Sequence, residues 1–65
     1  MAKINGKEVT IKPGMTVDEM LSLEGYSMEK IAVEKNGEIL PKSLYHATVV
    51  EEEDTFEVVS FVGGG

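Results

Sequence analysis

Hydrophobic residues along this chain occur in short runs that alternate with polar positions, and two Asn-Gly pairs interrupt these runs. Asn-Gly readily takes the positive φ that a type I′ hairpin turn requires at both central positions. Each pair is therefore predicted to join two antiparallel strands. The first hairpin would join residues 3–4 to 7–11 across Asn5-Gly6, and the second would join 31–35 to 38–40 across Asn36-Gly37. In the second hairpin, Lys35 and Glu38 would face each other as an opposite-charge pair.

A short helix is predicted to begin at Thr16, between the two hairpins. The Thr16 hydroxyl can accept a hydrogen bond from the amide of Glu19, and the Glu19 carboxylate can accept one from the amide of Thr16, which together form a capping box. Asp18 suits the positive end of the helix dipole. One apolar stripe recurs at helical spacing: Val17, Met20 and Leu21. Gly25 is a plausible end of the helix.

The second half of the chain reads as a connection followed by one strong strand. Pro41 should end the strand before it, and residues 42–46 are expected to be irregular or a single turn. Residues 48–50 are predicted as a short strand, and Glu51 to Asp54 as an exposed acidic turn. Residues 55–62 form the last predicted strand.

The predicted order is hairpin, helix, strand pair, short connection and final strand. One helix can cover only one face of a four- or five-stranded sheet, so the other face should be largely open. A final strand that follows the helix can pair in parallel with the first strand. The expected fold is therefore α+β: a β-grasp, or ubiquitin-like, mixed sheet packed on one face by a single main helix.

Length and charge narrow the function classes. The 65 residues are expected to form one domain, 1–65, and the absence of cysteine excludes a disulfide framework or a thiolate metal site. The formal net charge of −6 would repel nucleic acid and anionic membranes, so a basic protein surface is the expected partner. No apolar run approaches the ~20 residues of a membrane span and no signal peptide is visible, which predicts a cytoplasmic location.

The last predicted strand has two different faces. Alternation places Phe56 and Val58 toward the interior. The opposite face carries three residues: Glu57, Val59 and Phe61. Val59 and Phe61, followed by Val62, are either ordinary exposed apolar groups or candidates for docking a partner protein, and the pattern leaves both interpretations open.

Three glycines, Gly63, Gly64 and Gly65, close the sequence and are predicted to form a flexible tail. Glycine is costly to order and has no side chain to pack, so the end can simply be frayed. Alternatively, a backbone without Cβ atoms can thread a narrow channel and present its terminal carboxylate to an enzyme. Three extended residues reach about 10 Å, which is enough to enter an active-site cleft while the domain stays outside.

Two segments carry a resemblance to a known family. Residues 31–41, with the sequence IAVEKNGEILP, resemble a central segment of ThiS proteins, and residues 56–65, FEVVSFVGGG, resemble the ThiS C-terminus. The first hairpin, the helix capped by Thr16 and the length also fit this family. Two positions depart from the family pattern: Glu53-Asp54 stands where Gly-Asp is usual, and Tyr45 stands where Trp is frequent. Both concern turn and packing detail rather than the tail.

The resemblance implies a sulfur carrier that is not itself an enzyme and binds no cofactor. An E1-like adenylyltransferase of the ThiF type would use Mg-ATP to adenylate the carboxylate of Gly65. Sulfur from a donor such as a cysteine desulfurase would then give a thiocarboxylate, which a thiazole synthase of the ThiG type would use to form the thiazole of thiamine. Gly64 and Gly63 would give close passage and flexibility.

Other functions stay open beside the thiamine pathway. A Gly-Gly end is shared with molybdopterin-synthase small subunits and with ubiquitin, so delivery to molybdopterin or another sulfur pathway is an alternative, as is a ubiquitin-like modifier or binding module. No catalytic or metal site is predicted. His46 lacks a second ligand or a catalytic framework, and the acidic turn lacks the spacing of a calcium loop.

Overall fold

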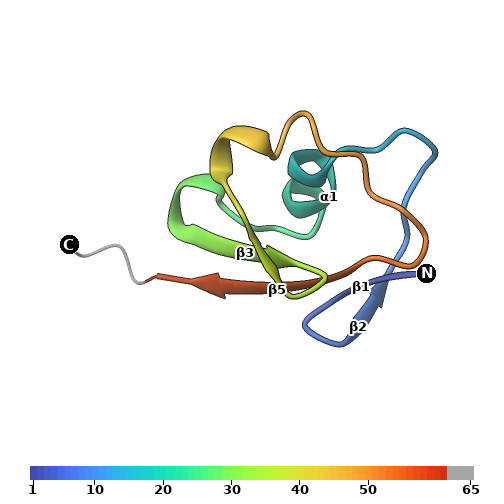
Figure 1. Cartoon of the computed structure of the whole chain (residues 1–65), viewed down its shortest axis with the longest axis horizontal. Helices are drawn as coiled ribbons and strands as arrows, with labels where there is room; N and C mark the ends of the chain where they lie inside the picture. The colour runs from blue at the N-terminus through green and yellow to red at the C-terminus, as the bar shows by residue number, and fades with distance from the viewer. Residues whose placement is uncertain (62–65) are drawn as a thin grey trace.

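The computed structural model describes residues 1–61 (Figure 1). Its elements, in chain order, are β1 (Ala2–Ile4), β2 (Lys7–Val9), α1 (Val17–Leu23), the 3₁₀ helix η1 (Met28–Lys30), β3 (Ile31–Lys35), β4 (Glu38–Leu40), the 3₁₀ helix η2 (Lys42–Leu44) and β5 (Thr55–Ser60). The strands and the main helix follow the predicted order, but the connection that precedes β5 differs from the prediction. In addition, η1 was not predicted, and β5 ends at Ser60 rather than at residue 62.

All five strands form one mixed sheet in the order β2-β1-β5-β3-β4. The hairpin partners β1 and β2 are antiparallel, as are β3 and β4, and β5 is antiparallel to β3. Among the strand pairs of residues 1–61, only β1 and β5 run parallel, with Lys3 opposite Thr55 and Ile4 opposite Phe56. The final strand thus lies between the two hairpins, which confirms the predicted β-grasp fold.

Both hairpin turns have the predicted backbone. Asn5 and Asn36 each have φ of 52°, and the glycines that follow them have φ of 83° and 86°. Lys35 lies opposite Glu38 across the second turn, as expected. The first hairpin is shorter than predicted, because β2 ends at Val9 rather than at residue 11.

The helix α1 has a defined cap at each end. Thr16 and Glu19 form the predicted capping box, in which the Thr16 amide donates to the Glu19 carboxylate at 3.0 Å. At the other end, the Tyr26 amide donates to the carbonyl of Leu21 and the Gly25 amide to that of Ser22, each at 3.0 Å. These two bonds form a Schellman motif, and the φ of 90° at Gly25 explains why glycine stands there.

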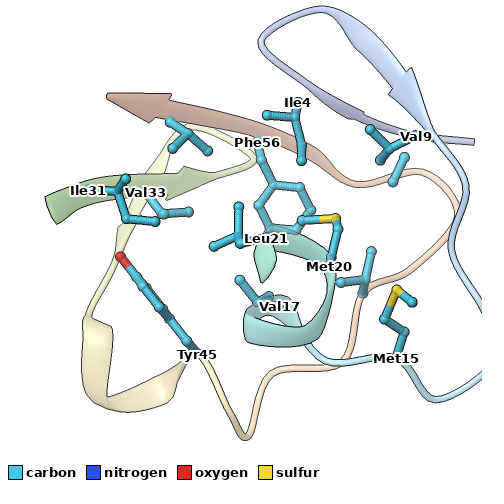
Figure 2. Close-up of a cluster of buried hydrophobic side chains, with 13 residues drawn as sticks. Ile4, Val9, Met15, Val17, Met20, Leu21, Ile31, Val33, Tyr45 and Phe56 are labelled. Carbon is cyan, nitrogen blue, oxygen red and sulfur yellow. The ribbon is translucent and has the colours of Figure 1, made fainter. Parts of the chain in front are cut away.

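The core lies between α1 and one face of the sheet (Figure 2). Phe56 points from β5 toward Leu21 and Met20 of the helix, and all three are at most 1% exposed. The buried apolar set is Ala2, Ile4, Val9, Met15, Val17, Met20, Leu21, Ile31, Val33, Tyr45, Val50, Phe56 and Val58. Within residues 1–61, no helix or strand covers the opposite face of the sheet (Figure 1).

The segment before β5 corrects two predictions. Residues 48–50 are not a strand, and only Val49 makes an isolated bridge, to Thr16. The backbone here instead satisfies the residues that begin α1: the Thr48 carbonyl accepts from the Val17 amide at 2.9 Å, and the Val50 amide donates to the Met15 carbonyl at 2.8 Å. The second correction concerns the acidic turn, since Glu51 to Glu53 are exposed but Asp54 is buried.

Candidate functional site

The candidate site is the carboxyl end of β5, from which the chain continues toward the glycines. β5 is the central strand of the sheet, but β1 pairs only with its first two residues, so the last residues of β5 lie beside β3 alone. Val62, Gly63, Gly64 and Gly65 lie outside the described residues, and the roles assigned to them stay predictions. The structure describes the contacts that hold β5, the strand that leads to these residues.

The Asn5 side chain holds β5 beyond the end of β1. In the parallel pairing of β1 and β5, the Asn5 amide donates a hydrogen bond to the carbonyl of Phe56 at 2.8 Å. From there the side chain reaches one step further: its Oδ1 accepts from the Val58 amide at 2.9 Å and its Nδ2 donates to the Val58 carbonyl at 3.1 Å. A side-chain amide therefore replaces the backbone of a neighbouring strand at Val58.

The other side of β5 stays paired to its last residues. Ser60 lies opposite Ile31 in β3, and the Phe61 amide donates to the carbonyl of Lys30 at 2.8 Å. The backbone of Phe61 is therefore fixed although the residue follows the end of the strand. Its side chain is 53% exposed and that of Val59 is 62% exposed. Both lie on the outer face of the sheet, as strand alternation predicted, whereas their role in docking stays a prediction.

A buried carboxylate fixes the start of β5. Asp54 is 5% exposed, and its oxygens accept from the Glu51 amide at 2.8 Å and from the Asn36 side chain at 2.9 Å. The ammonium of Lys35 lies 3.6 Å away. Burial by itself raises the pKa of Asp54, but the hydrogen bonds from Glu51 and Asn36 and the charge of Lys35 outweigh it, so the pKa lies below its ordinary value.

Sequence reasoning missed this role of Asp54. Asn36 also accepts from the Thr55 amide at 2.9 Å, so the second hairpin turn and the residue before β5 are joined by one polar network. Its sequence signal was weak, since Asp54 stands at the end of an acidic run and its partner Asn36 is 18 positions away. The network joins the hairpin turn to the start of β5, and we assign it a structural role.

The remaining candidates do not assemble into another site. His46 is exposed, and within residues 1–61 no three His, Asp or Glu side chains are grouped so as to hold a metal ion. Tyr45 is 3% exposed, and burial raises the pKa of its hydroxyl. None of the helices in this part of the chain is long and apolar enough to span a membrane.

Comparisons with known proteins give a consistent picture. A model of the ThiS family matches residues 2–65. The sulfur carrier protein ThiS of Bacillus subtilis is 36% identical over 66 aligned positions, which cover all of both chains. The crystal structure of a thiamine biosynthesis protein (ThiS) from Geobacter metallireducens has a TM-score of 0.76 and 37% identity, and the match covers 98% of this chain and 97% of that one.

A second group of relatives is much longer. The thiazole synthase of Paramagnetospirillum magneticum is 45% identical over 62 residues, and that of Magnetococcus marinus is 39% identical over the same length. The match covers 95% of this chain but only 19% of each synthase, so the synthases contain a segment similar to it. Because the family match runs from residue 2 to residue 65 and a relative of matching length is 36% identical, this chain belongs to the ThiS family.

Proposed function

We propose that this chain is a sulfur carrier whose terminal carboxylate, on Gly65, becomes a thiocarboxylate that supplies the sulfur of the thiamine thiazole. The observation that carries the proposal is the match to the ThiS family, which runs through the glycine run to residue 65. The similarity to a sulfur carrier protein from Bacillus subtilis over the full length of both chains supports it.

The chemistry explains why a carrier of this kind needs an activating enzyme. A carboxylate is a poor electrophile, because the oxygen that must leave carries negative charge. An E1-like adenylyltransferase of the ThiF type would join the carboxylate to AMP from Mg-ATP and release pyrophosphate. The outer sulfur of a persulfide, carried by a donor such as a cysteine desulfurase, would then attack the acyl-adenylate, release AMP and form an acyl disulfide. A thiol would reduce the S–S bond of that disulfide by forming a new disulfide with the donor sulfur, which leaves the thiocarboxylate on the carrier. No side chain of the carrier takes part in these steps.

The fold supports the proposal through the position of β5. Phe61 is held at a defined place, so the four residues that follow can reach at most about 14 Å from it when extended. That reach allows the glycines to enter a narrow active site while the folded domain stays outside. Exposed Val59 and Phe61, with Val62 next in sequence, are the proposed docking residues.

The thiazole synthases that contain a similar segment support a thiazole synthase of the ThiG type as the acceptor of the sulfur. We assign the chain no catalytic residue and no bound cofactor, since ATP and Mg²⁺ would be used by the adenylyltransferase. The cytoplasmic location and a single domain over 1–65 stay predictions from the sequence.

Intact mass spectrometry tests the proposal. The full chain is incubated with the adenylyltransferase, Mg-ATP, a persulfide donor and a thiol reductant, and its mass should increase by the difference between sulfur and oxygen. A variant without Gly64 and Gly65 should keep its circular dichroism spectrum and melting temperature but gain no mass. If the full chain gains no mass while the Bacillus subtilis carrier does so with its own enzyme, the proposal is wrong.

Complementation separates the pathways. Expression of the chain in a thiamine auxotroph that lacks its own carrier should restore growth without thiamine. Rescue of a molybdopterin-deficient strain alone would instead assign the chain to that pathway. Stable isopeptide conjugates to lysine residues of other proteins would identify a modifier.

A further inference from the structure

The open face of the sheet carries two carboxylates directly opposite each other. Glu34 of β3 is in register with Glu57 of β5, and both side chains are exposed. Residues opposite each other in an antiparallel pair have Cα atoms about 4.5–5.5 Å apart. Like charges in this position destabilise the sheet, so the pair contributes nothing favourable to the free fold.

No ion pair among residues 1–61 includes Glu34 or Glu57. Within residues 1–61, the ion pairs join the amino terminus to Glu52 and Lys35 to Asp54. Lys35 neighbours Glu34 in sequence, but strand alternation places it on the other face, where it meets Asp54. Lys3 shares the outer face and lies diagonally from Glu57, with which it borders one pocket, but the two side chains form no ion pair. The described residues thus place no ammonium in contact with the carboxylate of Glu34 or Glu57.

Apolar groups flank the carboxylate pair on the same face. Ile39 of β4 lies opposite Glu34 and is 80% exposed. On the side toward the carboxyl end of β5, Val59 lies opposite Ala32, and Phe61 follows. The face therefore has one row with two adjacent negative charges and, beside it, an exposed apolar area that leads to the chain end. We call these residues, Ala32, Glu34, Ile39, Glu57, Val59 and Phe61, the docking face.

A second copy of the chain is a poor occupant for this surface. In a symmetric dimer each docking face would meet itself, which would bring four carboxylates together between two chains that each carry a net charge of −6. A surface that places a cation against the two carboxylates would instead relieve a repulsion already present in the free protein, so binding such a surface is favoured by charge complementarity.

We propose that the docking face binds a basic protein surface, in which an arginine or lysine lies between Glu34 and Glu57 while an apolar side chain packs on Val59 and Phe61. Arginine is the better fit, because its planar guanidinium can donate to two carboxylates at once. This inference rests on the proposed function and deepens it, since it assigns this surface to the adenylating enzyme. Glu34 and Glu57 then select that partner, and the apolar area supplies contact next to the reacting tail.

The proposal makes a combined prediction for stability and binding. Glu34→Gln and Glu57→Gln remove a repulsion from the free protein, so each should unfold at a urea concentration equal to or higher than that of the wild type. Glu34→Lys should go further, because it creates an opposite-charge pair with Glu57 across the strands. All three should nevertheless be poorer substrates. Residues with a purely structural role would lose stability and activity together.

Steady-state adenylation supplies the binding measurement, with the full chain as the varied substrate, the adenylyltransferase and Mg-ATP. Loss of one charge-assisted contact should raise KM roughly fivefold to tenfold for each glutamine variant, with a smaller change in kcat. The difference from the wild type should shrink between low and high salt, because the Debye length falls from about 10 Å at 0.1 M to 3 Å at 1 M. Glu24→Gln, at the end of α1 and away from the docking face, is the control with the same change in net charge and should keep the wild-type KM.

The outcomes separate this inference from the proposed function. If the wild type is not adenylated at all, the proposed function fails first. If the wild type reacts but both glutamine variants keep its KM at low salt, the carboxylates do not meet a cation and this inference is overturned. The inference is also overturned if Phe61→Ser raises KM while Glu34→Gln and Glu57→Gln keep the wild-type KM, because binding would then depend on the apolar area alone. Concentration-dependent dimerisation of the wild type that Phe61→Ser abolishes would identify the docking face as a contact between copies and would also overturn it.

Discussion

Replacing Asn5 should destabilise the protein through a strand 53 positions away in sequence. The Asn5 side chain occupies the place of a neighbouring strand and makes two hydrogen bonds with the backbone of Val58, at 2.9 and 3.1 Å. Asn5→Gly removes both bonds but keeps the turn, because glycine adopts the φ of 52° without strain. The Val58 amide and carbonyl are then left without these partners on that side of β5.

The size of the effect follows from the two lost bonds. An intramolecular hydrogen bond contributes about 0.5–1.5 kcal/mol net, so Asn5→Gly should lower the free energy of unfolding by about 1–3 kcal/mol. For a domain of this size that corresponds to a melting temperature lower by roughly 4–8 °C for each kcal/mol. Asn5→Ala should cost about 1 kcal/mol more than Asn5→Gly, because alanine carries a Cβ atom into the left-handed region.

Urea unfolding followed by circular dichroism measures these differences. Lys7→Gln is the matched control on the same hairpin, and because Lys7 is exposed its free energy of unfolding should stay within about 0.5 kcal/mol of the wild type. Hydrogen exchange at the Val58 amide should be faster in Asn5→Gly than in the control. If Asn5→Gly matches Lys7→Gln in stability and in exchange, the side chain does not hold β5 and the reasoning is wrong.

Three further predictions concern the carboxylate network, the helix end and the core. Because folding lowers the pKa of Asp54, its stabilising effect is present above the unfolded value of about 3.9 and is lost as pH falls through the folded value. The stability difference between wild type and Asp54→Asn should therefore shrink below about pH 4, and a difference that stays constant down to pH 2 would contradict this. Gly25→Ala should lower the free energy of unfolding in urea by about 1–2 kcal/mol, because φ at this position is 90°. A steric clash is not the cause, since nothing lies within 4 Å of the added Cβ. An unchanged urea midpoint would show that this φ is not needed. Met20→Ala should cost about 2–5 kcal/mol, since Met20 is 1% exposed in the core, and a smaller loss would mean that the core closes around the cavity.

The parts of the fold that local sequence determines were predictable. Asn-Gly turns need only their own backbone freedom, and the capping box of α1 joins residues three positions apart, so both hairpins and the helix start are confirmed. The parallel placement of β5 beside β1 followed from the order of the elements. Residues 48–50 misled the prediction because Thr and Val favour strands, whereas tertiary contacts with the start of α1 decide their backbone.

The candidate site was predictable only as far as strand alternation reaches. It placed Val59 and Phe61 on the outer face, which the structure confirms. It could not show that Glu34 and Glu57 are direct neighbours, because that depends on the register between β3 and β5. The acidic run also led to the prediction that Asp54 is exposed. Its partners Asn36 and Lys35 belong to the second hairpin, and only the folded chain brings them next to Asp54.

The position of β5 bears on how such a chain end can be delivered. A terminal segment normally frays, because its backbone bonds open at little cost. Here β5 lies between two strands, its start is fixed by Asp54 and Asn36, and Asn5 supplies the pairing that β1 is too short to give. The Phe61 amide is still bonded to Lys30, so an ordered backbone reaches to within two residues of the first glycine of the run. A partner that binds the proposed docking face would therefore find Phe61 at a fixed place relative to that face. In the proposed function the strand and the tail would therefore have separate tasks: the strand would set the position of Phe61, and the four residues after it would set the reach.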